Sequence, residues 1–227
     1  MAIDEKGKNA LESYRLARYS MHLQVYEHHT RLVADDMFLK AIKLALNEGC
    51  LPKESFDISQ SNFVENYLKF DDFSVQHEIL QNSNGLAKEL INDIRNRKLL
   101  KRAVVVSLTK GGVNNALKRK KLRDMSAEKI EEYEKKIADE VGIDPAYLIV
   151  HLQSIKIKLY ERFDQIGMKE KPIYVKGRNN RVYSFDEESP FSAVLAPISK
   201  LYVFCPENKV TKTKSVAEQL FGITSEL

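Results

Sequence analysis

A segment near the amino terminus, ARYSMHLQVYEHHTR at residues 17–31, carries an arginine, a histidine and a tyrosine at four-residue steps: Arg18, His22 and Tyr26. On an α-helix this spacing places all three side chains in one stripe. A guanidinium, an imidazole and a phenol in a row can contact the phosphate, sugar and base of a nucleotide. A solvated helix face with a tyrosine lying over it explains the same spacing, so both interpretations stay open.

A second group of cations, Arg95, Arg97, Lys98, Lys101 and Arg102 (RNRKLLKR), lies where the expected helical part meets the first expected strand. Arg97 and Lys101 are four residues apart, so a helix would place both on one side, where they could hold a polyphosphate. Cations that stabilise a helix carboxyl terminus are the alternative. A third basic stretch, KRKKLRD at 118–124, has no interleaved aromatic residues, which argues against stacking on single-stranded nucleic acid.

The histidines do not form a recognisable metal motif. None of the five is followed by aspartate, no HExxH sequence occurs, and the adjacent His28 and His29 would point about 100° apart on a helix. The sequence also lacks a nucleophile elbow and a phosphate-binding glycine loop. We therefore expect neither catalytic residues nor metal ligands in this chain.

Composition indicates a folded protein. The 227 residues include 43% hydrophobic and 30% charged residues, and the net charge of +4 permits phosphate ligands without requiring them. Only Cys50 and Cys205 are present, which fits a reducing, cytoplasmic compartment and packing roles for both thiols. No run of about 18 apolar residues and no signal sequence is seen, so we expect neither export nor a membrane span.

Apolar periodicity predicts helix for most of residues 1–100. The helical pattern over 9–48 shifts phase near His28 and His29, which predicts two helices, the second ending at Gly49. Shorter helices are expected at 62–68, 74–81 and 86–97, and no strand is expected in this part. A β-branched run at 103–108 then predicts a strand, and we place a domain boundary near residue 100.

Residues 101–227 are expected to form a second, α+β domain. The predicted elements are a helix from Ser126 to Val141, strands at 147–152 and 201–205, a hairpin of 173–175 with 182–185, a short helix opened by Ser189 and Pro190, and a helix at 215–221. Their order resembles a split β-α-β unit. The predicted fold class is therefore α+β: a mainly helical amino-terminal part, then a small antiparallel sheet with helices on one face.

The segment KGKNALESYRLARYSMHLQVYEHHTR resembles the region just downstream of the catalytic core in HD-domain dNTP triphosphohydrolases. DDFSVQHEIL at 71–80 and IRNRKLLKRAVV at 94–105 resemble later segments of the same family. The resemblance implies that Arg18 touches substrate phosphate, that His22 and Tyr26 line the nucleotide pocket, and that His28 supports that wall. It also implies that Arg97 and Lys101 bind the phosphates of an effector nucleotide.

Members of that family hold their metal with a histidine, a His-Asp pair and a distant aspartate upstream of the matching helix. These ligands are absent here, so the resemblance implies a non-catalytic carboxy-terminal part that is inactive alone, with a divalent metal only in the complete enzyme. The expected partners are a (d)NTP or related phosphate ester, an amino-terminal HD domain and further copies of the chain. The alternatives are a stand-alone nucleotide- or RNA-binding module that uses the basic clusters, and a purely structural interaction domain.

Overall fold

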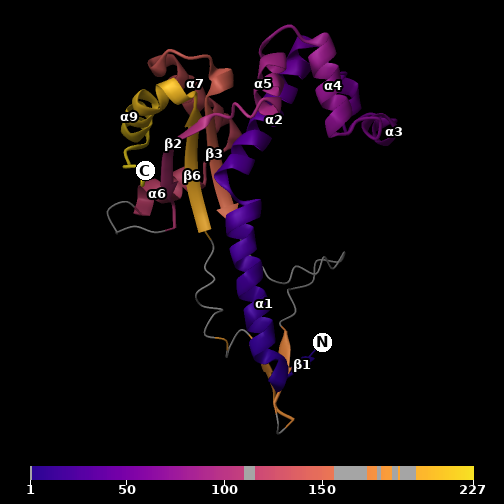
Figure 1. Cartoon of the computed structure of the whole chain (residues 1–227), viewed down its shortest axis with the longest axis vertical. Coiled ribbons are helices and arrows are strands. Elements are labelled where there is room, and N and C mark those ends of the chain that lie inside the picture. Colours follow the sequence, from indigo (N-terminus) through magenta and orange to yellow (C-terminus); the bar gives the residue numbers. More distant parts are fainter. Residues whose placement is uncertain (1, 110–115, 156–172, 178–179, 186–188, 190–197) are drawn as a thin grey trace. The chain divides into compact units, whose positions relative to one another are not determined.

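The computed structural model describes residues 2–109, 116–155, 173–177, 180–185, 189 and 198–227 (Figure 1). Its backbone contacts divide the chain into two compact units. The first comprises residues 1–28 and 153–199, and the second comprises residues 29–152 and 200–227. The predicted domain boundary at residue 100 does not coincide with this division and stays a prediction.

The predicted break in the first helical stretch is confirmed. Helix α1 (Lys8–Met21) passes into a π-helical turn, η2 (His22–Tyr26), and α2 (His29–Glu48) begins three residues later. The wider turn is marked by the backbone amide of Glu27, which donates to the carbonyl of His22 at 2.9 Å. Gly49, with a φ of +77°, follows α2 in the left-handed region where only glycine is unstrained, as predicted.

The second unit begins with a helical layer built around α2. Its further elements are η3 (Lys53–Phe56), α3 (Phe63–Tyr67), α4 (Asp72–Asn82) and α5 (Leu86–Arg95), which confirms the three predicted short helices to within about two residues at each end. Met37, Ala41 and Ala45 of α2 are fully buried in one cluster with Leu90 and Ile91 of α5. This spacing gives α2 the apolar stripe of a core helix.

A three-stranded sheet completes the second unit. It contains β2 (Lys101–Ser107), β3 (Ile149–Ile155) and β6 (Ile198–Cys205) in the order β2-β6-β3, with β2 and β6 antiparallel. Helices α6 (Ala116–Arg123) and α7 (Ala127–Val141) connect β2 to β3, and α9 (Val210–Phe221) follows β6. Because β6 lies between the two strands that these helices connect, the arrangement is that of a split β-α-β unit, and the predicted α+β class is confirmed.

Helices cover both faces of this sheet, so the expectation of helices on one face is wrong. Val104 and Val106 of β2 pack in a cluster with α7 and α9, whereas Val105 and Phe204 pack in the cluster that contains α2. The physical reason is visible in the sequence AVVVSL, which is apolar without alternation. Such a run is typical of a strand that is buried on both sides.

The first unit contains a second small sheet, in the order β1-β4-β5. The predicted hairpin is confirmed as β4 (Tyr174–Lys176) antiparallel to β5 (Val182–Ser184), but it pairs with the parallel strand β1 (Ala2–Asp4) and not with β2-β6-β3. The expectation of no strand in the first hundred residues is therefore wrong, because a three-residue strand carries no local signal. The short helix predicted from Ser189 and Pro190 falls outside the described residues.

None of the helices in the described part of the chain combines the length and apolar character needed to cross a bilayer.

Candidate functional site

The π-helical turn η2 brings His22 and Tyr26 together. Their ring centroids lie 5.0 Å apart with the planes inclined by 47°. The Tyr26 side chain is 47% exposed and His22 is half-buried, so the pair presents an aromatic surface to solvent. π-helical turns occur frequently at functional sites, because the inserted residue changes where the side chains of one turn point.

Arg18 and His28 lie on either side of this pair. Arg18 is exposed in the last turn of α1, and its Nη1 donates to the hydroxyl of Tyr14 at 3.3 Å. His28 is also exposed, and its backbone amide donates to the carbonyl of Val25 at 3.4 Å. The structure thus places His22 beside Tyr26, whereas Arg18 makes its hydrogen bond one turn toward the amino terminus.

Gln153 holds the residue that follows the π-helical turn, and the sequence contained no signal for this role. Its Nε2 donates to the backbone carbonyl of Glu27 at 3.1 Å and to the Glu27 carboxylate at 3.0 Å. Gln153 is only 4% exposed, so both hydrogen bonds form away from competing water. The chain direction immediately after Tyr26 is therefore fixed by a buried amide from β3.

Arg97 and Lys101 do not share a helix, so the common helical side considered from their spacing is wrong. Helix α5 ends at Arg95, and Arg97 adopts a left-handed backbone with a φ of +56°. The amide of Arg97 donates to the carbonyl of Ile94 at 3.0 Å, and the amide of Lys98 donates to that of Asp93 at 2.8 Å. This is a Schellman termination with arginine at the position that usually holds glycine.

The five cations around this turn have no ionic partners among the residues that the structure describes. Arg95, Arg97, Lys98 and Lys101 are exposed and Arg102 is half-buried. Within the described ranges none of the five side chains forms a hydrogen bond or an ion pair. Their donors remain available to an anion from solution, and phosphate is the anion for which guanidinium groups have matching geometry.

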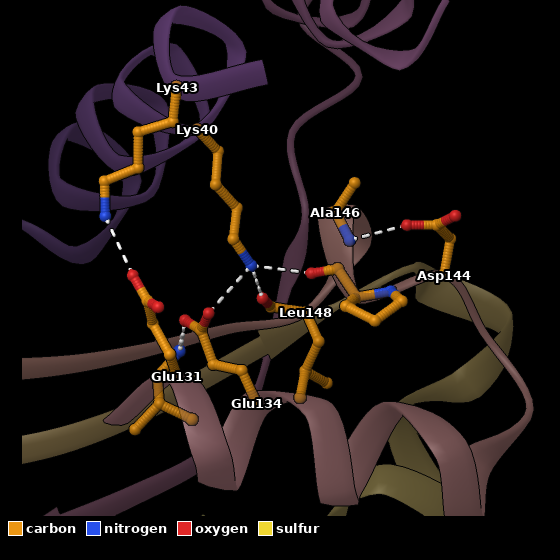
Figure 2. A network of polar contacts seen from close by, with 9 residues as sticks. Lys40, Lys43, Glu131, Glu134, Asp144, Ala146 and Leu148 are labelled. Atoms are coloured by element: carbon orange, nitrogen blue, oxygen red, sulfur yellow. Dashed lines mark hydrogen bonds and ion pairs between the residues drawn. The ribbon is translucent and has the colours of Figure 1, made fainter. Parts of the chain in front are cut away.

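A buried ion pair between Lys40 of α2 and Glu134 of α7 lies elsewhere in the second unit (Figure 2). The Lys40 ammonium lies 3.0 Å from the Glu134 carboxylate and donates to the carbonyls of Pro145, at 2.6 Å, and Leu148. The other carboxylate oxygen of Glu134 accepts from the amide of Val150 at 2.9 Å. Burial lowers the pKa of the Lys40 ammonium, and the charge of Glu134 opposes this shift.

This network is structural in its chemistry, because all three ammonium donors of Lys40 are used within the protein. One turn earlier on α2, Asp36 lies 2.7 Å from Nδ1 of His151 on β3. Asp36 is partly buried in this contact with the sheet. The two contacts fix α2 along the β3 edge.

Metal ligation is not supported by the described side chains. No three His, Cys, Asp or Glu residues in the described ranges gather closely enough to hold an ion. The described residues therefore do not fit the divalent metal that hydrolysis of a phosphate ester would require.

Three comparisons with known proteins add to this geometry. A protein-family model described as "HD associated region" matches residues 1–226. The chain is similar to a solved hypothetical protein from Aquifex aeolicus, with a TM-score of 0.57 and 20% identity over 95% of this chain and 47% of that one. It is also similar to a phosphohydrolase from Bacteroides thetaiotaomicron, with a TM-score of 0.56 and 17% identity over 90% of this chain and 51% of that one.

This chain therefore spans about half the length of each of these two solved structures. At these identities the likeness establishes a shared fold. No curated protein matches the chain.

Proposed function

The chain belongs to the HD-associated region family, and from this premise we propose that it is the non-catalytic part of an HD-type nucleotide phosphohydrolase. In this proposal it contributes one wall of a nucleotide pocket and surfaces for self-association. The metal and the chemistry belong to an amino-terminal HD domain that supplies the attacking water. The substrate is a (d)NTP or a related phosphate ester, and the complete enzyme acts in the cytoplasm.

The contact between His22 and Tyr26 is the single observation that carries this proposal. An exposed phenol beside an imidazole offers a face on which a base can stack and donors for a sugar hydroxyl. Arg18, exposed one turn earlier, offers a guanidinium to phosphate, and His28 supports the wall from the other side. The proposed roles of these four side chains are those implied by the resemblance to HD-domain phosphohydrolases, and the chemistry of the side chains is compatible with them.

Arg97 and Lys101 are proposed to bind the phosphates of an effector nucleotide. The support for this role is that both side chains are exposed and lack ionic partners among the described residues. They belong to the second compact unit, whereas Arg18, His22 and Tyr26 belong to the first. The proposal therefore assigns the two groups to separate sites.

Titration of the chain with dATP, dGTP and their ribonucleotide counterparts tests the wall. Tyr26→Ala and His22→Ala should each weaken binding by about tenfold, equivalent to the loss of about 1.4 kcal/mol. Tyr174→Ala is the matched control, because Tyr174 is 41% exposed but lies on β4. Equal losses in all three variants, or no binding by the parent chain, would overturn the assignment.

A hydrolysis assay tests the proposal that catalysis requires a separate HD domain. The chain with Mn²⁺ or Mg²⁺ alone should release no phosphate or triphosphate, and addition of a folded HD-domain polypeptide should produce activity that Arg18→Ala reduces. Hydrolysis by the chain alone would contradict a non-catalytic role. A folded HD partner that stays inactive with this chain would count equally against it.

The second candidate function is a stand-alone nucleotide- or RNA-binding module. It is favoured by the five cations around Arg97, which have no ionic partner in the described part of the chain. Such a module should bind oligonucleotides with steep salt dependence, because each neutralised phosphate releases counterions. Binding measured at two salt concentrations separates the candidates. Weak, salt-insensitive binding of RNA together with tight nucleotide binding supports the first proposal.

A further inference from the structure

Large apolar side chains are exposed along residues 57–73, which we call the arm. Ile58 and Phe73 are each 82% exposed, Leu68 is 76% exposed and Val64 is 64% exposed. Val64 and Leu68 are four residues apart, so they lie on one side of the turn formed by α3. Exposed apolar side chains gathered in this way mark interaction surfaces.

The other side of the arm is already packed. Phe56 contacts the rings of Tyr67 and Phe70 at centroid distances of 6.3 and 5.4 Å, and Phe63 contacts Tyr67 at 5.3 Å. Phe56 and Phe70 pack in turn against the helical core of the second unit. The arm is therefore anchored by one set of aromatic residues while Val64 and Leu68 remain available.

Carboxylates lie close in sequence to these apolar side chains. The arm contains Asp57, Glu65, Asp71 and Asp72 and a single cation, Lys69. Hydrogen bonds from Ser59 lower the pKa of Asp57, and hydrogen bonds from Ser74 lower that of Asp71, so both stay charged at neutral pH. Glu65 and Asp72 are exposed and have no ionic partner in the described part of the chain.

Helix α6 carries the opposite charge beside an exposed apolar side chain. Its inner side is fixed by buried Leu122, by Lys118, which donates to the carbonyl of Gly222 at 3.1 Å, and by Arg119, which donates to that of Ser107. Leu117, 76% exposed, and the exposed Lys120 and Lys121 follow at three- and four-residue steps, so they share the outer side. Neither lysine has an ionic partner within the described residues.

We propose that the arm of one chain docks the outer side of α6 of a second copy. Apolar side chains with an anionic rim would meet an exposed leucine with a cationic rim, which gives both burial and electrostatic complementarity. Leu68 and Leu117 are each 76% exposed, so these two surfaces do not cover each other within one chain. The inference gives a location to the self-association in the proposed function and rests on that part of it.

Each chain carries both surfaces, so the proposal places this contact twice in a two-fold dimer. The arm of the first copy then meets α6 of the second, and the arm of the second meets α6 of the first. This doubling buries both apolar patches and leaves no unpaired surface of this kind to extend the assembly.

Reciprocal charge reversal tests the contact by light scattering coupled to size exclusion. The first variant carries Glu65→Lys and Asp72→Lys, and the second carries Lys120→Glu and Lys121→Glu. The parent chain should have the mass of two chains, whereas each variant alone should have the mass of one, because like charges then face each other. An equimolar mixture of the two variants should recover the mass of two chains, since both contacts again pair opposite charges.

Control variants distinguish the loss of the dimer contact from a loss of folding and from a loss of nucleotide binding. Asp139→Lys with Glu140→Lys makes the same charge change as the arm variant on exposed positions of α7 and should leave the dimer intact. Leu68→Glu should give single chains with an unchanged circular dichroism spectrum. A monomeric parent chain, or variants that stay dimeric, would overturn the inference, while nucleotide titration of the monomeric variants tests the pocket wall independently.

Discussion

The Lys40 ammonium and the Glu134 carboxylate, 3.0 Å apart, together satisfy two backbone groups along the outer edge of the sheet. Lys40 donates to the carbonyl of Leu148, and Glu134 accepts from the amide of Val150. The Lys40 ammonium and the Glu134 carboxylate thus replace the amide and the carbonyl that a further strand would present to β3. Because the backbone groups are already paired, this stretch of the edge is closed to another chain. The pair therefore combines helix attachment with edge protection.

Removal of one member of this pair should destabilise the protein strongly. Lys40→Met leaves the Glu134 carboxylate buried without its cation and the Leu148 carbonyl without its donor, so we expect a loss of about 3 kcal/mol in the free energy of unfolding. Denaturant titration measures this loss. Adding Glu134→Gln to Lys40→Met should restore part of it, because an amide oxygen can still accept from Val150 without a buried charge.

Lys43→Met is the matched control for this prediction. Lys43 pairs with Glu131 at 3.2 Å one turn from Lys40, but both side chains are more than half exposed, so the loss should stay below about 1 kcal/mol. Equal losses for Lys40→Met and Lys43→Met would show that burial does not set the energy of the inner pair.

Local pattern predicted the elements well, and long-range contacts account for what it missed. The apolar steps of α2 and the β-branched run of β2 were visible because each element is defined by its own periodicity. The roles of Lys40 and Asp36 were not visible, because Leu148 and His151 lie more than a hundred residues away along the chain. A charged residue on a helix gives no local sign that it will be buried by a distant strand.

The features of the candidate site were likewise predictable only where they depend on local sequence. The proximity of His22 and Tyr26 was predictable from four-residue spacing, which survives the change from an α-helical to a π-helical turn. The helix end at Arg95 was not predictable, because arginine replaces the glycine that normally signals a left-handed termination at position 97. The contact of Gln153 with Glu27 was not predictable, because nothing in the sequence around Gln153 indicates it.

Arg97→Gly should stabilise the chain and weaken anion binding together. A non-glycine residue in the left-handed region is strained, so glycine should raise the free energy of unfolding by about 0.5 to 1 kcal/mol. Loss of the guanidinium should weaken binding of tripolyphosphate by about fivefold, measured by calorimetry. Arg97→Ala keeps the strain, so it should weaken binding without the gain in stability, and equal stability of both variants would contradict the prediction.

Gln153→Leu should impair nucleotide binding although Gln153 is assigned no contact with the nucleotide. It removes both hydrogen bonds to Glu27 and with them the restraint on the residues that follow Tyr26, so we expect a several-fold rise in Kd and a loss of about 1 to 2 kcal/mol in stability. Gln76 is half-buried on α4, so Gln76→Leu is the control for the change in polarity. An unchanged Kd in Gln153→Leu would remove its positioning role.

Asp71 should make the stability of the arm depend on acid pH. Its carboxylate accepts from the amide of Ser74 at 2.7 Å in a capping box at the start of α4, and the hydrogen bonds from Ser74 lower its pKa from the ordinary aspartate value. A lowered pKa means that the contribution of Asp71 is complete at pH values well above the pKa of an unfolded aspartate, about 3.9, and is lost as the pH falls through the folded value. The loss on acidification should therefore be larger in the parent chain than in a variant with a neutral cap.

Asp71→Asn provides that variant, because asparagine caps helices about as well as aspartate but does not titrate. Thermal unfolding of both proteins at pH 7, 4 and 2.5 should show the advantage of the parent chain shrinking toward the lowest pH. Asp71→Ala should be the least stable of the three at pH 7, since it has no acceptor for the Ser74 amide. A constant difference between aspartate and asparagine across this range would mean that protonation of Asp71 does not affect the stability of the arm.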